Sequence, residues 1–145
     1  MAELPLADGI VVPPALPAGL RVLLAEDHPV NQELVVMLLE EVGVQVDVVT
    51  DGEAAVQRAR ASSYDLALLD IHMPRMDGLA ACRAIRQLPG WSHVPVVAMT
   101  ASAFESDREA CLAAGMSDFI AKPLLAEVFY AVLKRWLVDA GRQAA

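Results

Sequence analysis

Four short apolar runs of the sequence end on side chains that can do chemistry. Glu26 and Asp27 follow the first run, Asp70 ends the next, Thr100 ends another and Lys122 follows the last. Carboxylates that are brought together repel one another, and each resists ionising unless a cation offsets the charge. A set of carboxylate ligands without a His or Cys cluster suits Mg²⁺. The residue types therefore predict a magnesium site, if the fold brings these run ends together.

The other two side chains indicate what the metal would serve. A lysine and a threonine supply a point positive charge and a hydroxyl donor, the groups that hold phosphoryl oxygens. The chain has no P-loop and no glycine-rich dinucleotide turn, so the phosphoryl group need not arrive on a bound nucleotide. An aspartate can itself accept a phosphoryl group, as in aspartyl-phosphate chemistry.

The elements that must position these residues follow from the hydrophobic pattern, in which short apolar runs alternate with segments of helical period. The predicted strands span residues 21–27, 44–50, 64–70, 94–100 and 118–122, and the predicted helices span 29–43, 51–62, 79–88, 106–115 and 124–137. Unbroken Val, Leu and Ala runs indicate strands covered on both faces, hence a parallel sheet with right-handed crossovers. The fold class is an open, doubly wound α/β sheet, whose ligands bind at the carboxyl ends of the strands.

Helical spacing also predicts which side chains face inward. The first helix is expected to bury Val30, Leu34, Leu38 and Val42, and the last helix Leu125, Val128, Val132 and Trp136. His28 and Asp51 stand where the first and second helices begin, so both are candidate N-caps.

Length and composition set the organisation. A chain of 145 residues fits one domain. Residues 1–20 hold four of the nine prolines and are expected to be a linker or tail, followed by a domain over 21–138 and a tail over 139–145. The apolar residues within 1–20 leave open that part of this segment packs on the domain. Cys82 and Cys111 are expected to be buried free thiols.

Charge and hydropathy exclude several classes of partner. The net charge of −8 argues against direct nucleic-acid binding. No apolar run approaches the roughly 18 residues of a membrane span, and the first residues are acidic where a signal peptide is basic. We therefore expect a soluble cytoplasmic protein with no direct membrane contact.

From Arg21 to about Leu137 the chain resembles the receiver domain of two-component response regulators, and most closely the receivers of hybrid sensor histidine kinases. The resemblance rests on "LLAEDHPVNQ", "LLDIHMPRMDG", "VVAMTA" and "FIAKP". It implies a flavodoxin-like fold with one five-stranded sheet in the order 2-1-3-4-5. If the chain belongs to a hybrid kinase, it would lie on the cytoplasmic side of the membrane.

The resemblance also implies the roles of the acidic residues. Asp70 would be the phosphoacceptor. Glu26 and Asp27 would bind Mg²⁺ directly or through water, together with Asp70 and the backbone carbonyl of His72. A Glu-Asp pair in place of Asp-Asp is common in the family.

The remaining motif residues would respond to phosphorylation. Thr100 would donate a hydrogen bond to a phosphoryl oxygen, and Lys122 would pair with another. Phe119 stands at the position of the family's switch aromatic, and the Lys122–Pro123 peptide is expected to be cis.

The resemblance further implies a signalling role, with self-phosphorylation and self-dephosphorylation as the only activities. A histidine kinase or a histidine phosphotransfer domain would donate the phosphoryl group to Asp70. The surface of the fourth helix, fifth strand and last helix would then change and signal to a protein partner. A homodimer formed on phosphorylation is left open.

Because no output domain follows residue 137, we expect the signal to leave through protein contact. The chain could be cut from a hybrid kinase, with residues 1–20 as the joining linker, or could be a stand-alone regulator; "HPVNQ", "RMDG" and "AMTA" favour the first.

Alternative readings of the motif remain. A degenerate receiver could serve only as a docking module. An aspartyl-nucleophile phosphatase of the haloacid-dehalogenase kind needs a second Asp two residues after the nucleophile, where His72 stands instead. His28 beside the acidic pair suggests zinc, but a zinc site needs three or four converging ligands.

Overall fold

The computed structural model describes residues 13–73, 75–101 and 105–139. The five strands are β1 (Arg21–Ala25), β2 (Gln45–Val49), β3 (Leu66–Asp70), β4 (Val96–Thr100) and β5 (Asp118–Ala121). The helices are α1 (Pro29–Glu41), α2 (Gly52–Ala61), α3 (Gly78–Arg86), α4 (Glu105–Ala113) and α5 (Ala126–Lys134), and a π-helical turn over Arg135–Asp139 follows α5.

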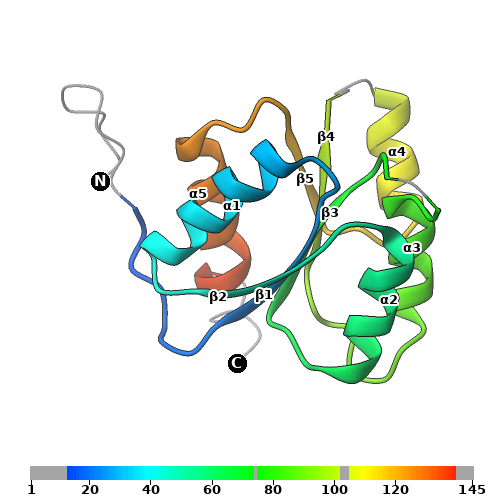
Figure 1. Ribbon diagram of the computed structural model, residues 1–145, viewed down its shortest axis with the longest axis horizontal. Coiled ribbons are helices and arrows are strands. Elements are labelled where there is room, and N and C mark those ends of the chain that lie inside the picture. Colours follow the sequence, from blue (N-terminus) through cyan, green and yellow to red (C-terminus); the bar gives the residue numbers. More distant parts are fainter. Residues whose placement is uncertain (1–12, 74, 102–104, 140–145) are drawn as a thin grey trace.

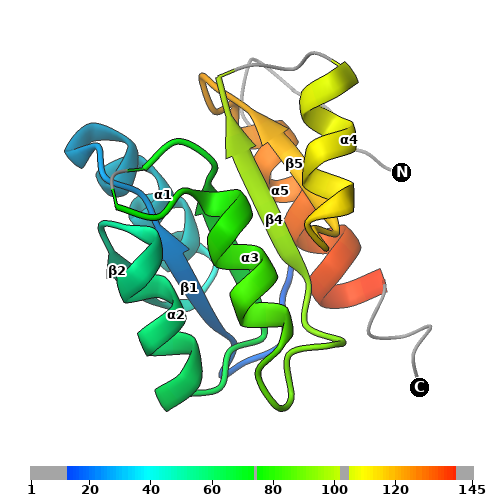
Figure 2. The same ribbon diagram turned by 90° about the vertical axis from the view of Figure 1, so that its right-hand side faces the viewer.

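The strands form one parallel sheet in the order β2-β1-β3-β4-β5. In Figure 1, α1 and α5 cover one face of this sheet, and α2, α3 and α4 cover the other. Figure 2 shows the three helices of the second face side by side. This is the doubly wound, flavodoxin-like fold expected from the sequence, and it is confirmed.

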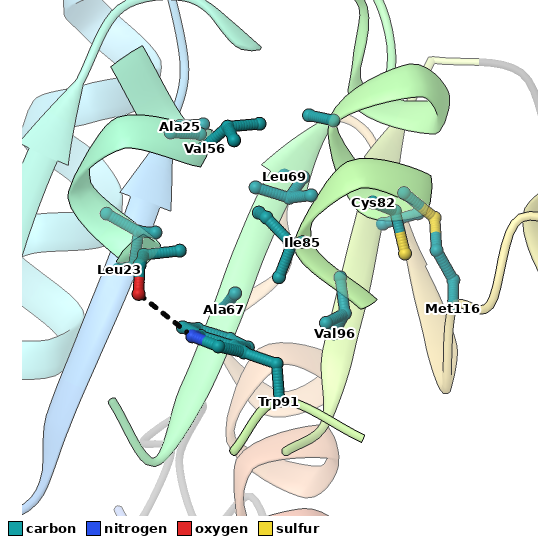
Figure 3. Close-up of a cluster of buried hydrophobic side chains, with 14 of the residues drawn as sticks. Leu23, Ala25, Val56, Ala67, Leu69, Cys82, Ile85, Trp91, Val96 and Met116 are labelled. Carbon is teal, nitrogen blue, oxygen red and sulfur yellow. Dashed lines mark hydrogen bonds between the residues drawn. The ribbon is translucent and has the colours of Figure 1, made fainter. Parts of the chain in front are cut away.

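Both faces of the two strands β3 and β4 are buried. All five residues of β3 and of β4 are buried, as their unbroken apolar runs predict. Figure 3 shows the core between the sheet and α2–α4, where Ile85 and Leu69 face each other and Trp91 closes one end. The indole Nε1 of Trp91 donates a 3.0 Å hydrogen bond to the carbonyl of Ala59.

The predicted state of the two cysteines is confirmed. Cys82 and Cys111 are both buried in this core, and neither is joined in a disulfide. Burial raises the pKa of Cys82, which keeps its thiol protonated and inert at neutral pH.

The inward faces of the two helices on the opposite side differ from the prediction. α1 buries Val35, Leu38 and Leu39. Of the four residues predicted to face inward, Leu38 is buried and Leu34 and Val42 pack partly against the core, whereas Val30 is 65% exposed. α1 is apolar around most of its circumference, so counting apolar positions does not determine which arc faces the sheet.

The buried face of α5 also differs from the predicted one. It buries Phe129, Tyr130, Val132 and Leu133. Leu125 and Val128 are largely exposed instead. Of the four residues predicted to face inward, Val132 is buried and Trp136 packs partly against the core.

The two predicted caps also have different outcomes. Asp51 caps α2 through its side chain, because Oδ1 accepts a 2.8 Å hydrogen bond from the amide of Ala54. His28 occupies the N-cap position of α1 but makes no capping bond with its side chain. Its backbone amide donates to Glu26 instead.

The described part of the N-terminal segment packs on the domain. Leu16 and Leu20 lie against the core formed with α1 and α5, and β1 begins at Arg21. Residues 1–12, which include most of the apolar side chains of the predicted linker, lie outside the described residues. Among the helices that the structure describes, none combines the length and apolarity needed to cross a bilayer.

Candidate functional site

The carboxyl ends of four strands bring the predicted site residues to one edge of the sheet. Glu26 and Asp27 follow β1, Asp70 ends β3, Thr100 ends β4 and Lys122 follows β5. Strand pairing keeps the ends of β4 and β5 in register, since the amide of Lys122 donates a 2.7 Å hydrogen bond to the carbonyl of Thr100. The fold thus gathers side chains that are up to about a hundred positions apart in the sequence.

Lys122 lies between two buried carboxylates. Its Nζ is 2.9 Å from Asp70 Oδ2 and 2.9 Å from Glu26 Oε1. The side chain of Glu26 is fully buried and that of Asp70 is 6% exposed, while that of Lys122 is 17% exposed. One ammonium group therefore offsets two carboxylate charges that water cannot screen well.

Backbone amides fix the other oxygen of each carboxylate. The amide of His28 donates to Glu26 Oε2, and the amide of His72 donates to Asp70 Oδ1, both at 3.0 Å. Each donor lies two residues after the carboxylate that it holds. The turns after β1 and β3 thus orient both acidic side chains toward Lys122.

Burial controls the ionisation of this group. Burial raises the pKa of Glu26; Lys122 and the His28 amide oppose this rise without cancelling it, and the charge of Asp70 adds to it. Burial by itself would lower the pKa of Lys122, but hydrogen bonds and charge from Asp70 and Glu26 outweigh it and raise that pKa. Lys122 therefore stays charged at neutral pH.

The acidic residues form a set that suits a hard metal ion. Glu26, Asp27 and Asp70 each offer a carboxylate oxygen, and these oxygens all lie within 4.8 Å of one another. Glu26 Oε1 is buried and accepts no well-aligned hydrogen bond from the described groups, although Lys122 pairs with it by charge. An all-oxygen donor set fits Mg²⁺, which prefers carboxylates and water.

A glycine lets the next helix begin directly against Asp70. A Cβ on Gly78 would lie 2.4 Å from the carbonyl oxygen of Asp70 and 2.8 Å from Cα of Ile71. No side chain fits there, so Gly78 is required for the close approach of α3 to the end of β3.

An ion pair joins the loop between β3 and α3 to the start of α2. Arg75, in the left-handed region with φ 66°, places its Nη1 2.7 Å from Asp51 Oδ2. Sequence reasoning identified Asp51 as a cap but missed this pair, because no local pattern indicates a contact between residues 24 positions apart.

Phe119 lies next to this site on the face covered by α3 and α4. It pairs with Ala98 across β4 and β5, and its half-buried ring packs against the core on that face. The guanidinium carbon of Arg108, on α4, lies 4.4 Å from the centre of the ring. The Lys122–Pro123 peptide is cis, the isomer that the resemblance implies.

Comparison with known proteins agrees with this geometry. The family model for the response regulator receiver domain matches residues 22–134. The chain belongs to this family. This receiver is 41% identical over 123 residues to the signal transduction histidine-protein kinase BarA of Escherichia coli, covering 85% of this chain and 13% of BarA. It is 38% identical over 139 residues to the sensor protein GacS of Pseudomonas syringae pv. syringae, covering 92% of this chain and 15% of GacS.

Solved receiver structures resemble the chain as a whole. The receiver domain of the sensor histidine kinase PA1611 from Pseudomonas aeruginosa is 42% identical with a TM-score of 0.78, covering 83% of this chain and 98% of that one. That structure contains a magnesium ion coordinated in its active site cleft. The chain spans only 13 to 15% of the curated relatives BarA and GacS, so the likeness concerns their receiver domains.

Proposed function

We propose that this receiver accepts a phosphoryl group on Asp70 from a phosphohistidine in a two-component phosphorelay. The observation that carries the proposal is the position of Lys122, whose ammonium lies 2.9 Å from both Asp70 and Glu26 at the carboxyl edge of the sheet. Here it stands where the negative charge of a phosphoryl group on Asp70 would develop.

The described contacts supply the parts of this reaction that the protein must provide. The His72 amide fixes Asp70 Oδ1. An oxygen of the Asp70 carboxylate attacks phosphorus; the new O–P bond forms as the P–N bond of the phosphohistidine breaks, and the histidine nitrogen leaves with the bonding electrons. Lys122 then exchanges its contact with Asp70 for one with a phosphoryl oxygen, and Thr100 donates its hydroxyl to another.

Glu26, Asp27 and Asp70 would hold Mg²⁺, with the His72 carbonyl as a further ligand. The bound ion would neutralise charge on the phosphoryl oxygens during transfer. The magnesium ion of the PA1611 receiver and the clustered carboxylate oxygens of Glu26, Asp27 and Asp70 both support this assignment.

The donor and the output follow from the family. A histidine kinase or a histidine phosphotransfer domain would carry the phosphohistidine, and the likeness to BarA and GacS favours a hybrid sensor kinase as the parent protein. Phosphorylation adds up to about two negative charges at the edge of the sheet. That charge would draw Thr100 and Lys122 inward and shift the surface of α4, β5 and α5, where a protein partner would read it.

Intact-mass measurement tests the proposal directly. The protein and its Asp70→Asn variant are incubated with acetyl phosphate in Mg²⁺ and in chelator. One added phosphoryl group that requires both Mg²⁺ and Asp70 is the expected result.

Two other outcomes would overturn the proposal in different ways. Absence of any adduct and of released phosphate would favour a receiver that acts only as a docking module. Steady hydrolysis of a phosphomonoester over many turnovers would favour an aspartyl-nucleophile phosphatase instead.

A further inference from the structure

Phe119 lies on β5 beside helix α4, with Ala98 of β4 as its strand partner. Ala98 and Thr100 are two residues apart on β4, so their side chains share one face of the sheet. Phe119 pairs with Ala98 from the neighbouring strand and packs against the core on that same face. Any movement of Thr100 toward a phosphoryl group therefore changes the space beside the Phe119 ring.

Arg108 covers this ring from α4. Its guanidinium carbon lies 4.4 Å from the ring centre, within the range of a cation–π contact. Both residues line a hollow of about 280 Å³ between α4 and β5, together with Cys111, Leu112, Met116 and Asp118. The hollow gives the ring and helix α4 room to move relative to each other.

The Arg108 guanidinium is held over the Phe119 ring and does not extend into water. Its side chain is exposed, yet it lies over the ring. An exposed arginine loses rotamer freedom when it is held in one place. Here it lies over an aromatic face, which favours a guanidinium group through the ring quadrupole.

We propose that Arg108 is a positioning residue that holds Phe119 and α4 in the unphosphorylated arrangement. The inference rests on the proposed phosphoacceptor role of Asp70. A contact can shift an equilibrium only if it is stronger in one state than in the other. Movement of Thr100 toward a phosphoryl group would draw the ring away from Arg108, so loss of the contact should favour the phosphorylated-like arrangement.

Binding of beryllofluoride with Mg²⁺ measures this equilibrium, since the complex mimics an acylphosphate. The affinity is measured by calorimetry for the wild type, Arg108→Met and Arg108→Lys. Methionine keeps much of the packing volume without the charge, and lysine keeps the charge. We expect Arg108→Met to bind about two to five times more tightly, which corresponds to the strength of one exposed cation–π contact. Arg108→Lys should lie closer to the wild type.

A double-mutant cycle tests whether Arg108 acts through the ring. In a Phe119→Leu background, Arg108→Met should leave the affinity unchanged, because the aromatic partner is already gone. The matched control is Arg60→Met, an exposed arginine on α2 outside the hollow, which should bind as the wild type does.

A spectroscopic signal reports on the ring itself. The chain contains three phenylalanines, so ¹⁹F-labelled phenylalanine gives few resonances, and Phe119→Leu identifies the one of interest. In Arg108→Met without ligand, this resonance should shift toward its position in the wild-type beryllofluoride complex.

The outcomes separate the two proposals. If the wild type binds no beryllofluoride, the phosphoacceptor proposal fails. If the wild type binds and Arg108→Met binds equally or more weakly, or if its effect persists without the Phe119 ring, Arg108 does not hold the unphosphorylated arrangement.

Discussion

Lys122 Nζ lies 2.9 Å from Asp70 Oδ2, although 52 residues separate the two along the chain. The same ammonium lies 2.9 Å from Glu26 Oε1. Two buried carboxylates would repel each other without it, so the lysine contributes to folding as well as to the proposed chemistry. Removing one partner of a buried ion pair is costly, because the remaining charges stay buried without compensation.

We therefore expect Lys122→Met to lower the free energy of unfolding by about 1 to 3 kcal/mol. Phosphorylation of Asp70 by acetyl phosphate should slow by about a hundredfold, since the positive charge facing the phosphoryl oxygens is gone. Urea unfolding followed by circular dichroism gives the first value, and the rate of mass increase gives the second. Lys134→Met, on the exposed side of α5, is the control and should leave both unchanged. A Lys122 variant as stable and as reactive as the wild type would contradict this role.

Mg²⁺ should stabilise the folded protein. A ligand that binds only the folded state, and whose concentration is about ten times its dissociation constant, adds about 1.4 kcal/mol to the free energy of unfolding. For a domain of this size, this raises the melting temperature by about 3 to 6 °C. Asp27→Asn should remove most of this response, because Asp27 is an exposed member of the acidic set and its loss leaves the buried pair intact. Differential scanning fluorimetry with and without Mg²⁺ measures the shift.

The control for the metal prediction is Glu40→Gln, an exposed carboxylate on α1 that lies outside the acidic set. It should respond to Mg²⁺ as the wild type does. An equal response in Asp27→Asn would mean that the ion binds elsewhere or is held without Asp27.

The sequence predicted that the candidate site residues meet at one edge, because strand ends in a parallel sheet converge without knowledge of packing detail. Glu26, Asp70 and Lys122 could be placed at one edge once their strands were recognised, and the capping role of Asp51 followed from a local pattern. The strand order came from the family resemblance and not from the pattern itself.

The inward faces of α1 and α5 could not be predicted in the same way. α1 carries apolar residues on several sides, so Val30 fits the helical period as well as the residues that are actually buried. Leu125 is the N-cap of α5, where the helical period does not show whether a side chain is buried. The contacts of Arg75 with Asp51 and of Arg108 with Phe119 also escaped sequence analysis. Each joins two separate elements, and only the packing of the helices against the sheet brings the partners together.

Gly78 should tolerate no side chain. Gly78→Ala would place a Cβ 2.4 Å from the carbonyl oxygen of Asp70, so either α3 or the end of β3 must move. We expect a loss of about 1 to 3 kcal/mol in the free energy of unfolding, as for other overpacked sites, and slower phosphorylation because Asp70 shifts with its backbone. Urea unfolding and acetyl phosphate labelling measure the two effects.

Gly90→Ala separates crowding from backbone strain in this prediction. Gly90 has φ +85° with open space around its Cβ position, so alanine there should cost about 1 to 2 kcal/mol through strain alone. Its phosphorylation rate should match that of the wild type. If Gly78→Ala also keeps the wild-type rate, the close approach of α3 does not position Asp70.

The ion pair between Asp51 and Arg75 should make stability depend on pH. The hydrogen bond from the Ala54 amide lowers the pKa of Asp51, and Arg75 lowers it further, while burial opposes both. A carboxyl group with a lowered folded pKa stabilises the protein fully above its unfolded value of about 3.9, and this contribution is lost as the pH falls through the folded pKa. Asp51→Asn keeps a capping side chain but has no charge to titrate.

We therefore expect Asp51→Asn to be less stable than the wild type near pH 6 and to approach it as the pH falls toward about 3, because only the wild type loses this contribution. Urea unfolding at several pH values gives the two curves. Arg75→Met, which removes the ion pair but leaves the Ala54 hydrogen bond, should lie between them in its pH dependence. Parallel curves for the wild type and Asp51→Asn would show that the Asp51 charge does not hold the loop after β3 against α2.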